Sequence, residues 1–217
     1  MAKIFTQRPS TYTNLTTVGS GTYTPPAGAK FLKIKMVAGG GGGGGGGNGA
    51  TGGAGGTTTF GTSLLTALGG NAGSHTGGDG GTATINLPAY GISLKGGQGV
   101  GSGTMFQGDY FYNAGGAGGD SPIFGGGGKL SSDSAVGSAA AANTGGGGQG
   151  GGIPNGLGGT NPIGGGGGSG ACIDATIINP ASSYSYSIGT GGAGASGNYY
   201  NGGAGAAGII YIEEIYD

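Results

Sequence analysis

The sequence predicts a mainly β and irregular fold: about ten polyglycine II helices on a small base of β-strands, with almost no α-helix. Glycine supplies 66 of the 217 residues, about 30%, against ~7% on average. The glycines recur in runs of similar length, separated by short segments with the alternating hydrophobicity of strands. Collagen would need a strict Gly-X-Y period, which runs such as 39–47 lack. Disorder is the main alternative, and the regular punctuation of the runs favours a folded chain.

The beginning of the chain predicts an extended segment followed by a strand. Residues 1–28 are polar and end near Pro25 and Pro26, which block helix formation. We expect 1–28 to be an N-terminal extended segment and 29–217 to form the glycine-rich domain. Within 30–37, apolar residues alternate with lysines, which predicts a half-buried strand.

Further strands are predicted between the glycine runs and at the end of the chain. Residues 209–216 predict a strand, which we expect to pair with the strand at 30–37. Residues 82–95 and 171–188 each contain two extended stretches around turn residues, and each predicts a hairpin. Residues 57–68 are a third candidate for the base.

A glycine run can form a packed rod only beside other such rods. Polyproline II backbone has three residues per turn and no internal hydrogen bonds, so a buried rod must bond sideways to its neighbours. Close approach of the rods excludes a Cβ at the contact, as at the collagen axis. We therefore expect rods that leave and return to the base in alternation.

Following these passes predicts which segments lie at the base and which at the tip. We expect 114–128 to be one interrupted pass and 129–143 to be a loop at the base. Tip turns are expected near 48–51, 75–76, 104–113, 153–163 and 196–201. Charged residues then gather at the base: Lys30, Lys33, Lys35, Lys95, Lys129, Glu213 and Glu214.

The tip turns hold the candidate binding residues, because loops on a rigid frame commonly carry binding function and clustered aromatics mark recognition surfaces. The alternative is that these aromatics only pack on one another to cap the rods. The candidates are Met105, Phe106, Gln107, Asp109, Tyr110, Phe111, Tyr112, Asn198, Tyr199, Tyr200, Asn201, His75, Asn155 and Leu157.

Several classes of function are disfavoured. The net charge of −1 and the lack of a basic run argue against nucleic acid binding. His75 is the only histidine, Asp109 is the only acid expected at the tip, and no metal site, cofactor or enzyme activity is expected.

Cys172 is the only cysteine, so no internal disulfide can form, and we expect it to be a small buried residue. We expect neither a secretory signal at the N-terminus nor an apolar stretch long enough to span a bilayer.

Two stretches resemble the glycine-rich domains of phage tail fibre proteins. They are the entry GTYTPPAGAKFLKIKMVAGG at 21–40, and the exit YSYSIGTGGAG at 184–194 with GGAGAAGIIYIEE at 202–214. The architecture is most similar to tip adhesins of the long tail fibres of some T-even-like phages. The resemblance implies a receptor-binding protein at the distal tip of a virion fibre. Its distal loops would bind a bacterial outer-membrane protein or surface glycan. Its partner would be a trimeric fibre protein, to which residues 1–28 would attach.

Two other classes of function stay open. Glycine-rich polyproline II bundles also occur in ice-binding proteins, which need a flat and regular Thr/Ala face. A purely structural fibre component would have small polar loops, and the aromatic segment 104–113 does not fit that description.

Overall fold

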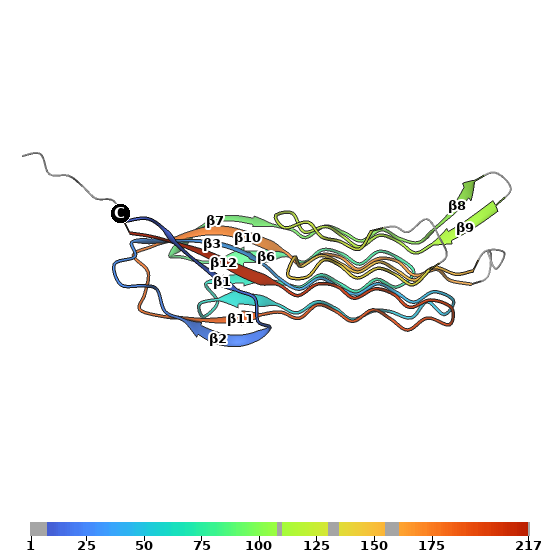
Figure 1. Cartoon of the computed structure of the whole chain (residues 1–217), viewed down its shortest axis with the longest axis horizontal. Helices are drawn as coiled ribbons and strands as arrows, with labels where there is room; N and C mark the ends of the chain where they lie inside the picture. The colour runs from blue at the N-terminus through green and yellow to red at the C-terminus, as the bar shows by residue number, and fades with distance from the viewer. Residues whose placement is uncertain (1–7, 108–109, 130–134, 155–160, 217) are drawn as a thin grey trace, which may run out of the picture.

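The computed structural model describes residues 8–107, 110–129, 135–154 and 161–216. The molecule is elongated (Figure 1). One end, which we call the base, contains two β-sheets. A long bundle of glycine-rich segments, the shaft, leads from the base to the distal end. The described residues contain no helix, and none of them belongs to a helix that could cross a membrane.

Twelve strands are found among the described residues. They are β1 (Thr11–Leu15), β2 (Gly19–Tyr23), β3 (Phe31–Val37), β4 (Thr58–Phe60), β5 (Leu65–Ala67), β6 (Ala83–Ile85), β7 (Ala89–Leu94), β8 (Gly103–Gln107), β9 (Tyr110–Ala114), β10 (Cys172–Ile178), β11 (Tyr184–Ile188) and β12 (Ile209–Ile215). The first sheet has the order β1-β12-β3-β10-β7, and the second has the order β2-β11-β4-β5-β6. All pairs are antiparallel, and β8 pairs with β9 as a separate ribbon.

The two sheets enclose one hydrophobic core. Leu32, Ile34 and Met36 of β3 are fully buried, while Lys33 and Lys35 on the opposite face are exposed. The core continues through the inward residues of β10 and β12 and meets aromatic rings of the second sheet, including Phe60. The predicted half-buried strand at 30–37 is therefore confirmed, as is its pairing with the strand at the end of the chain.

The two predicted hairpins are wrong. β6 belongs to the second sheet and β7 to the first, while β10 belongs to the first and β11 to the second. Each connection therefore crosses from one sheet to the other. Alternation specifies which residues face the core but not which strand is the hydrogen-bonding partner, so a crossing connection and a hairpin have the same sequence pattern.

The N-terminal segment is part of the base. β1 pairs with β12, and β2 pairs with β11. The expected boundary at residue 28 therefore does not separate the first strands from the two sheets. A buried polar cluster joins these strands: Glu214, fully buried, accepts hydrogen bonds from the hydroxyls of Thr11, Thr13 and Tyr23 at 2.9, 2.8 and 2.8 Å.

In the shaft, hydrogen bonds run between segments and repeat every three residues. Within 39–47, the N–H groups of Gly39, Gly42 and Gly45 donate to the segment at 50–56. The N–H groups of Gly40, Gly43 and Gly46 donate to the segment at 200–206. The N–H groups of Gly41, Gly44 and Gly47 donate to the segment at 162–168. Three other segments, at 70–73, 148–151 and 192–199, donate back to carbonyls of 39–47. This segment therefore has six bonded neighbours.

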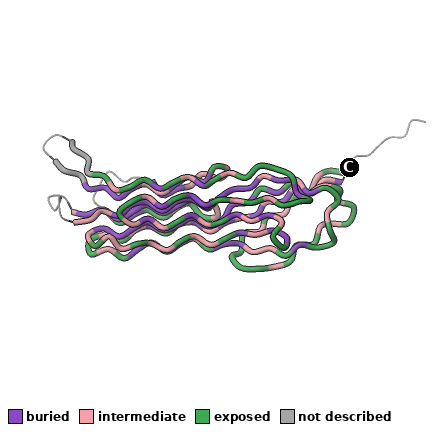
Figure 2. Tube along the Cα trace, turned by 180° about the vertical axis from the view of Figure 1, so that it is seen from behind, coloured by how far each residue is buried: buried purple, intermediate pink, exposed green. Residues whose placement is uncertain are grey.

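Close contact leaves no room for side chains inside the shaft. A Cβ on Gly40 would overlap the carbonyl of Gly146, and one on Gly43 would overlap that of Gln149. Side chains occur where a segment faces solvent, and in 51–57 every third residue is exposed. The buried and exposed positions along the segments are coloured in Figure 2.

The order of passes between 114 and 170 differs from the prediction. Residues 121–125 form a turn closed by Ser121 and Gly125, beside the buried Cys172 at the base. Residues 126–129 then lead away from the base, and 135–142 return along the shaft, from the level of Gly152 to that of Gly126. Residues 114–128 are thus two passes rather than one, and 135–142 are part of the shaft rather than a base loop. Lys129 accordingly lies along the shaft, where its carbonyl accepts a hydrogen bond from Ser138.

Candidate functional site

The distal end gathers turns that are far apart in the sequence. Residues 47–50, 74–76 and 196–201 meet there, and the β8–β9 ribbon stands beyond them (Figure 1). Backbone hydrogen bonds tie the turns to the shaft, since Gly46 donates to Tyr200 at 2.9 Å and Tyr199 donates to Gly46 at 3.1 Å. The turns are thus positioned by the same interactions that order the shaft.

The turn at 47–50 is built around Asn48. Its side-chain oxygen accepts the N–H of Ala50 at 3.1 Å, and its amide nitrogen donates to the carbonyl of Ser196 at 3.2 Å. Gly47 and Gly49 on either side have positive φ angles of 94° and 65°, a conformation that glycine adopts without penalty. Asn48 therefore closes its own turn and fixes the adjoining one.

The turn at 196–201 presents an aromatic ring. The side-chain oxygen of Asn201 accepts the N–H of Gly197 at 3.0 Å and closes the turn. The ring of Tyr199 covers Gly47, where a Cβ would overlap it. Tyr199 remains 42% exposed, and Asn198 beside it is exposed. A packed but accessible ring of this kind can contact a ligand at a small entropic cost.

His75 lies on a neighbouring turn. Its carbonyl accepts hydrogen bonds from the N–H and hydroxyl of Ser102 at 3.3 and 3.1 Å, which joins the turn to the residue before β8. Its imidazole covers Gly49 and is exposed to solvent. His75 and Tyr199 therefore cover the two glycines that flank Asn48.

The β8–β9 ribbon carries the predicted aromatic segment. Its register opposes Met105 to Tyr112, Phe106 to Phe111, and Gln107 to Tyr110. The sequence predicts a turn at 104–113, and the structure makes most of it a two-stranded ribbon. Its aromatic residues, such as Phe106 and Phe111, are of a type that favours strands.

The predicted site residues fall into three groups. His75, Asn198, Tyr199, Tyr200 and Asn201 lie together on the distal turns. Six others lie in the ribbon strands: Met105, Phe106, Gln107, Tyr110, Phe111 and Tyr112. Asp109, Asn155 and Leu157 lie outside the described residues.

The sequence predicts the turn at 48–51, but it does not predict that Asn48 and Ser102 fix neighbouring turns at the distal end. An asparagine between two glycines, as in Gly47-Asn48-Gly49, is itself a strong turn signal and could have identified the first of them. Among the described residues, no group of three His, Cys, Asp or Glu side chains could hold a metal ion.

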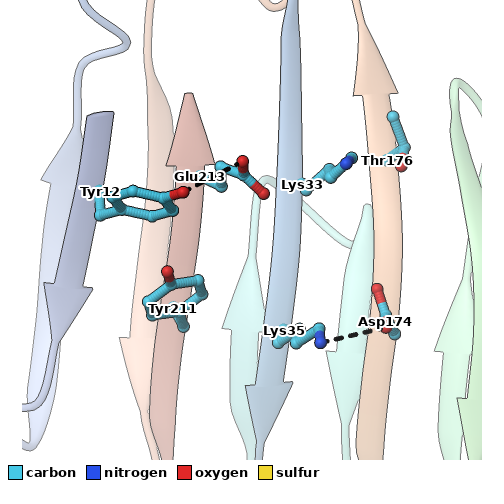
Figure 3. Close-up of a pocket in the computed structure, with 7 residues that line it drawn as sticks. All are labelled: Tyr12, Lys33, Lys35, Asp174, Thr176, Tyr211 and Glu213. Carbon is cyan, nitrogen blue, oxygen red and sulfur yellow. Dashed lines mark hydrogen bonds and ion pairs between the residues drawn. The ribbon is translucent and has the colours of Figure 1, made fainter. Parts of the chain in front are cut away.

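A second candidate site, a shallow pocket of about 470 Å³, lies on the outward face of the first sheet (Figure 3). Its lining residues are Tyr12, Lys33, Lys35, Asp174, Thr176, Tyr211 and Glu213. The sequence predicts charged residues at the base but not their assembly into a pocket, because that requires the strand order β1-β12-β3-β10.

Comparison with known proteins yields no relative. No protein-family model, no curated protein and no solved structure matches the chain.

Proposed function

We propose that this protein is a receptor-binding adhesin at the tip of a phage tail fibre, and that its shaft is a bundle of polyglycine II helices. The observation that carries the proposal is the placement of an accessible tyrosine, Tyr199, and a projecting ribbon at the far end of a shaft whose segments are joined by backbone hydrogen bonds. Binding loops are commonly held by rigid scaffolds in this way.

The three-residue repeat of hydrogen bonds supports the polyglycine II assignment. Successive N–H groups of 39–47 point to three different neighbours and then return to the first. A screw with three residues per turn gives that repeat, whereas in a strand the groups alternate with a period of two.

The position of the chain ends supports attachment through the base. β1, the first described strand, and β12, the last, pair with each other there, at the opposite end from the turns of Tyr199 and His75 (Figure 1). A fibre partner, expected to be trimeric, would join the base. The distal turns would then face a bacterial outer-membrane protein or surface glycan.

The test measures binding of fluorescently labelled protein to a panel of Gram-negative bacterial strains. The wild-type protein is expected to bind saturably to a subset of the strains. Tyr199→Ala, or replacement of 104–113 by a glycine-serine turn, is expected to abolish this binding while thermal unfolding stays unchanged. The matched control is Val18→Ala, which trims an equally exposed apolar side chain, 43% accessible, between β1 and β2 of the base. Retained binding in both distal variants, or wild-type binding to no strain, would contradict the proposal.

One lateral face of the shaft favours a second function, ice binding. Exposed small residues recur every third position on two neighbouring segments: Thr51, Ala54 and Thr57 on one, and Thr190, Ala193 and Ser196 on the other. Gly53 donates to Ala193, and Gly56 donates to Thr190, which sets the two rows side by side. Measured thermal hysteresis, lost on Ala193→Tyr, would favour this function over the adhesin.

A further inference from the structure

The outward face of the first sheet presents charged and aromatic side chains that lie outside the hydrophobic core. Two rows of side chains cross the strands. One row is Tyr12, Glu213, Lys33, Thr176 and Tyr90, and the other is Asn14, Tyr211, Lys35, Asp174 and Ile92. The pocket of Figure 3 lies across these rows.

The charged groups in the pocket are only partly satisfied by one another. Lys35 and Asp174 form an ion pair at 3.9 Å, the only one found among the described residues. Lys33 lies opposite Glu213 in the β3–β12 register, yet its side chain is directed toward β10 and Thr176 (Figure 3). Glu213 instead accepts a hydrogen bond from the hydroxyl of Tyr12 at 3.4 Å. The ammonium of Lys33 is therefore available to a ligand.

Two tyrosine rings lie in the same pocket on the β1 and β12 side of β3, whereas the ammonium of Lys33 points to the β10 side (Figure 3). Tyr12 and Tyr211 have ring centroids 5.7 Å apart and planes tilted by 32°, and Tyr12 is 59% exposed. The charge of Glu213, followed by burial, raises the pKa of the Tyr12 hydroxyl, so this group stays a hydrogen-bond donor at neutral pH. Tyr90, exposed at the other end of the same row, lies four strand spacings away, or ~19 Å at ~4.8 Å per strand.

We propose that this face is a binding site for an oligosaccharide that contains a carboxylate-bearing sugar. The C–H face of a sugar ring packs on tyrosine, whose ring is apolar and whose tip is polar. The carboxylates of Glu213 and Asp174 accept hydrogen bonds from sugar hydroxyls. Lys33 pairs with the carboxylate of the sugar. The length of the row, with a tyrosine at either end, suits a chain of sugars better than one small molecule.

The site is independent of the distal turns, and its test separates the two. Binding of oligogalacturonate, oligomannuronate and hyaluronan oligosaccharides is measured by isothermal titration calorimetry, with maltohexaose as the neutral comparison. The expected result is saturable binding of at least one acidic glycan, with maltohexaose at least about tenfold weaker, as loss of one charged hydrogen bond would give.

Variants assign the binding to this face. Lys33→Met and Tyr211→Ala are each expected to weaken the acidic glycan about tenfold or more. Lys95→Met makes the same charge change at an exposed residue outside the pocket and is expected to leave the binding unchanged. The proposal is overturned if none of the three acidic glycans binds, if maltohexaose binds equally well, or if Lys33→Met and Lys95→Met behave alike. Thermal unfolding of each variant verifies that it is folded.

Discussion

The base and the shaft of this molecule are stabilised by different parts of the chain. In the base, side chains such as Leu32, Ile34 and Ile212 fill the space between two sheets, and burial of their apolar surface provides the stability. In the shaft, the buried segment 39–46 has no side chain, and its contacts are backbone hydrogen bonds to six neighbours. A core of side chains can rearrange around a change in volume, whereas a backbone contact leaves no atom that can move aside.

The largest expected effect is therefore the addition of one methyl group to the shaft. In Gly43→Ala the new Cβ would overlap the carbonyl of Gln149 and lie 2.7 Å from the nitrogen of Gly150. We expect this variant to lose ~3 kcal/mol or more of unfolding free energy, measured by chemical denaturation.

Gly101→Ala is the matched control for this change. The nearest atom to its added Cβ is 3.8 Å away, and the residue is exposed at the side of the shaft. Its stability should stay within about 0.5 kcal/mol of the wild type. If Gly43→Ala is as stable as Gly101→Ala, the distinction between base and shaft fails.

In the base, the change expected to destabilise the protein is the removal of a buried side chain, not the addition of a methyl group. Ile212→Ala removes a fully buried side chain from β12 and is expected to cost ~2–5 kcal/mol, because a cavity remains. Ile178→Ala, in which the side chain is 46% exposed on β10, should cost ~1 kcal/mol or less. Equal losses in the two variants, measured by the same denaturation, would show that the side-chain core does not govern the stability of the base.

A smaller effect is expected from the buried polar cluster. Burial, followed by the hydrogen bond to Glu214, raises the pKa of the Tyr23 hydroxyl above its ordinary value of 10.0. The folded state thus binds this proton more tightly than the unfolded state. Its contribution to stability is fully present below about pH 10 and is lost as the pH rises through the folded-state pKa.

Tyr23→Phe isolates this contribution. The variant should be ~1–3 kcal/mol less stable at pH 7, because Glu214 loses a donor. It should also lose less stability than the wild type between about pH 10 and 12. Denaturation across this range tests both statements, with the exposed Tyr90→Phe as the control. An alkaline loss that is as steep in Tyr23→Phe as in the wild type contradicts the assignment.

Much of the base could be predicted from local pattern, including the pairing of β3 with β12, but the partners of the strands in the two expected hairpins could not. Leu32, Ile34 and Met36 alternate with lysines, so the buried face of β3 could be read directly from the sequence. The turn residues at 88–91 and 179–182 gave no indication that their flanking strands lie in different sheets. Glu214 resembles any acid near a chain end, and only the hydroxyls of three distant residues explain its burial.

The shaft and the distal site could likewise be predicted from the sequence only in part. Glycine spacing predicts that segments bond sideways, yet it does not distinguish a turn such as 121–125, which lies between two glycine runs, from an interruption within one pass. The aromatic residues Tyr199 and Tyr200 stand out in the sequence, and they lie on the distal turns as expected. The sheet pocket depends on four strands from three parts of the chain, and no local pattern reveals it.

The three-direction hydrogen bonding of segment 39–47 has a consequence for how such a chain can change length. Because the hydrogen-bond partners of this segment repeat every three residues, insertion of a single residue in its middle would direct every later N–H at the wrong neighbour. Lengthening by three residues in every segment keeps the directions. The turns at the distal end face no such condition, so insertions and deletions can accumulate there while the shaft keeps its length.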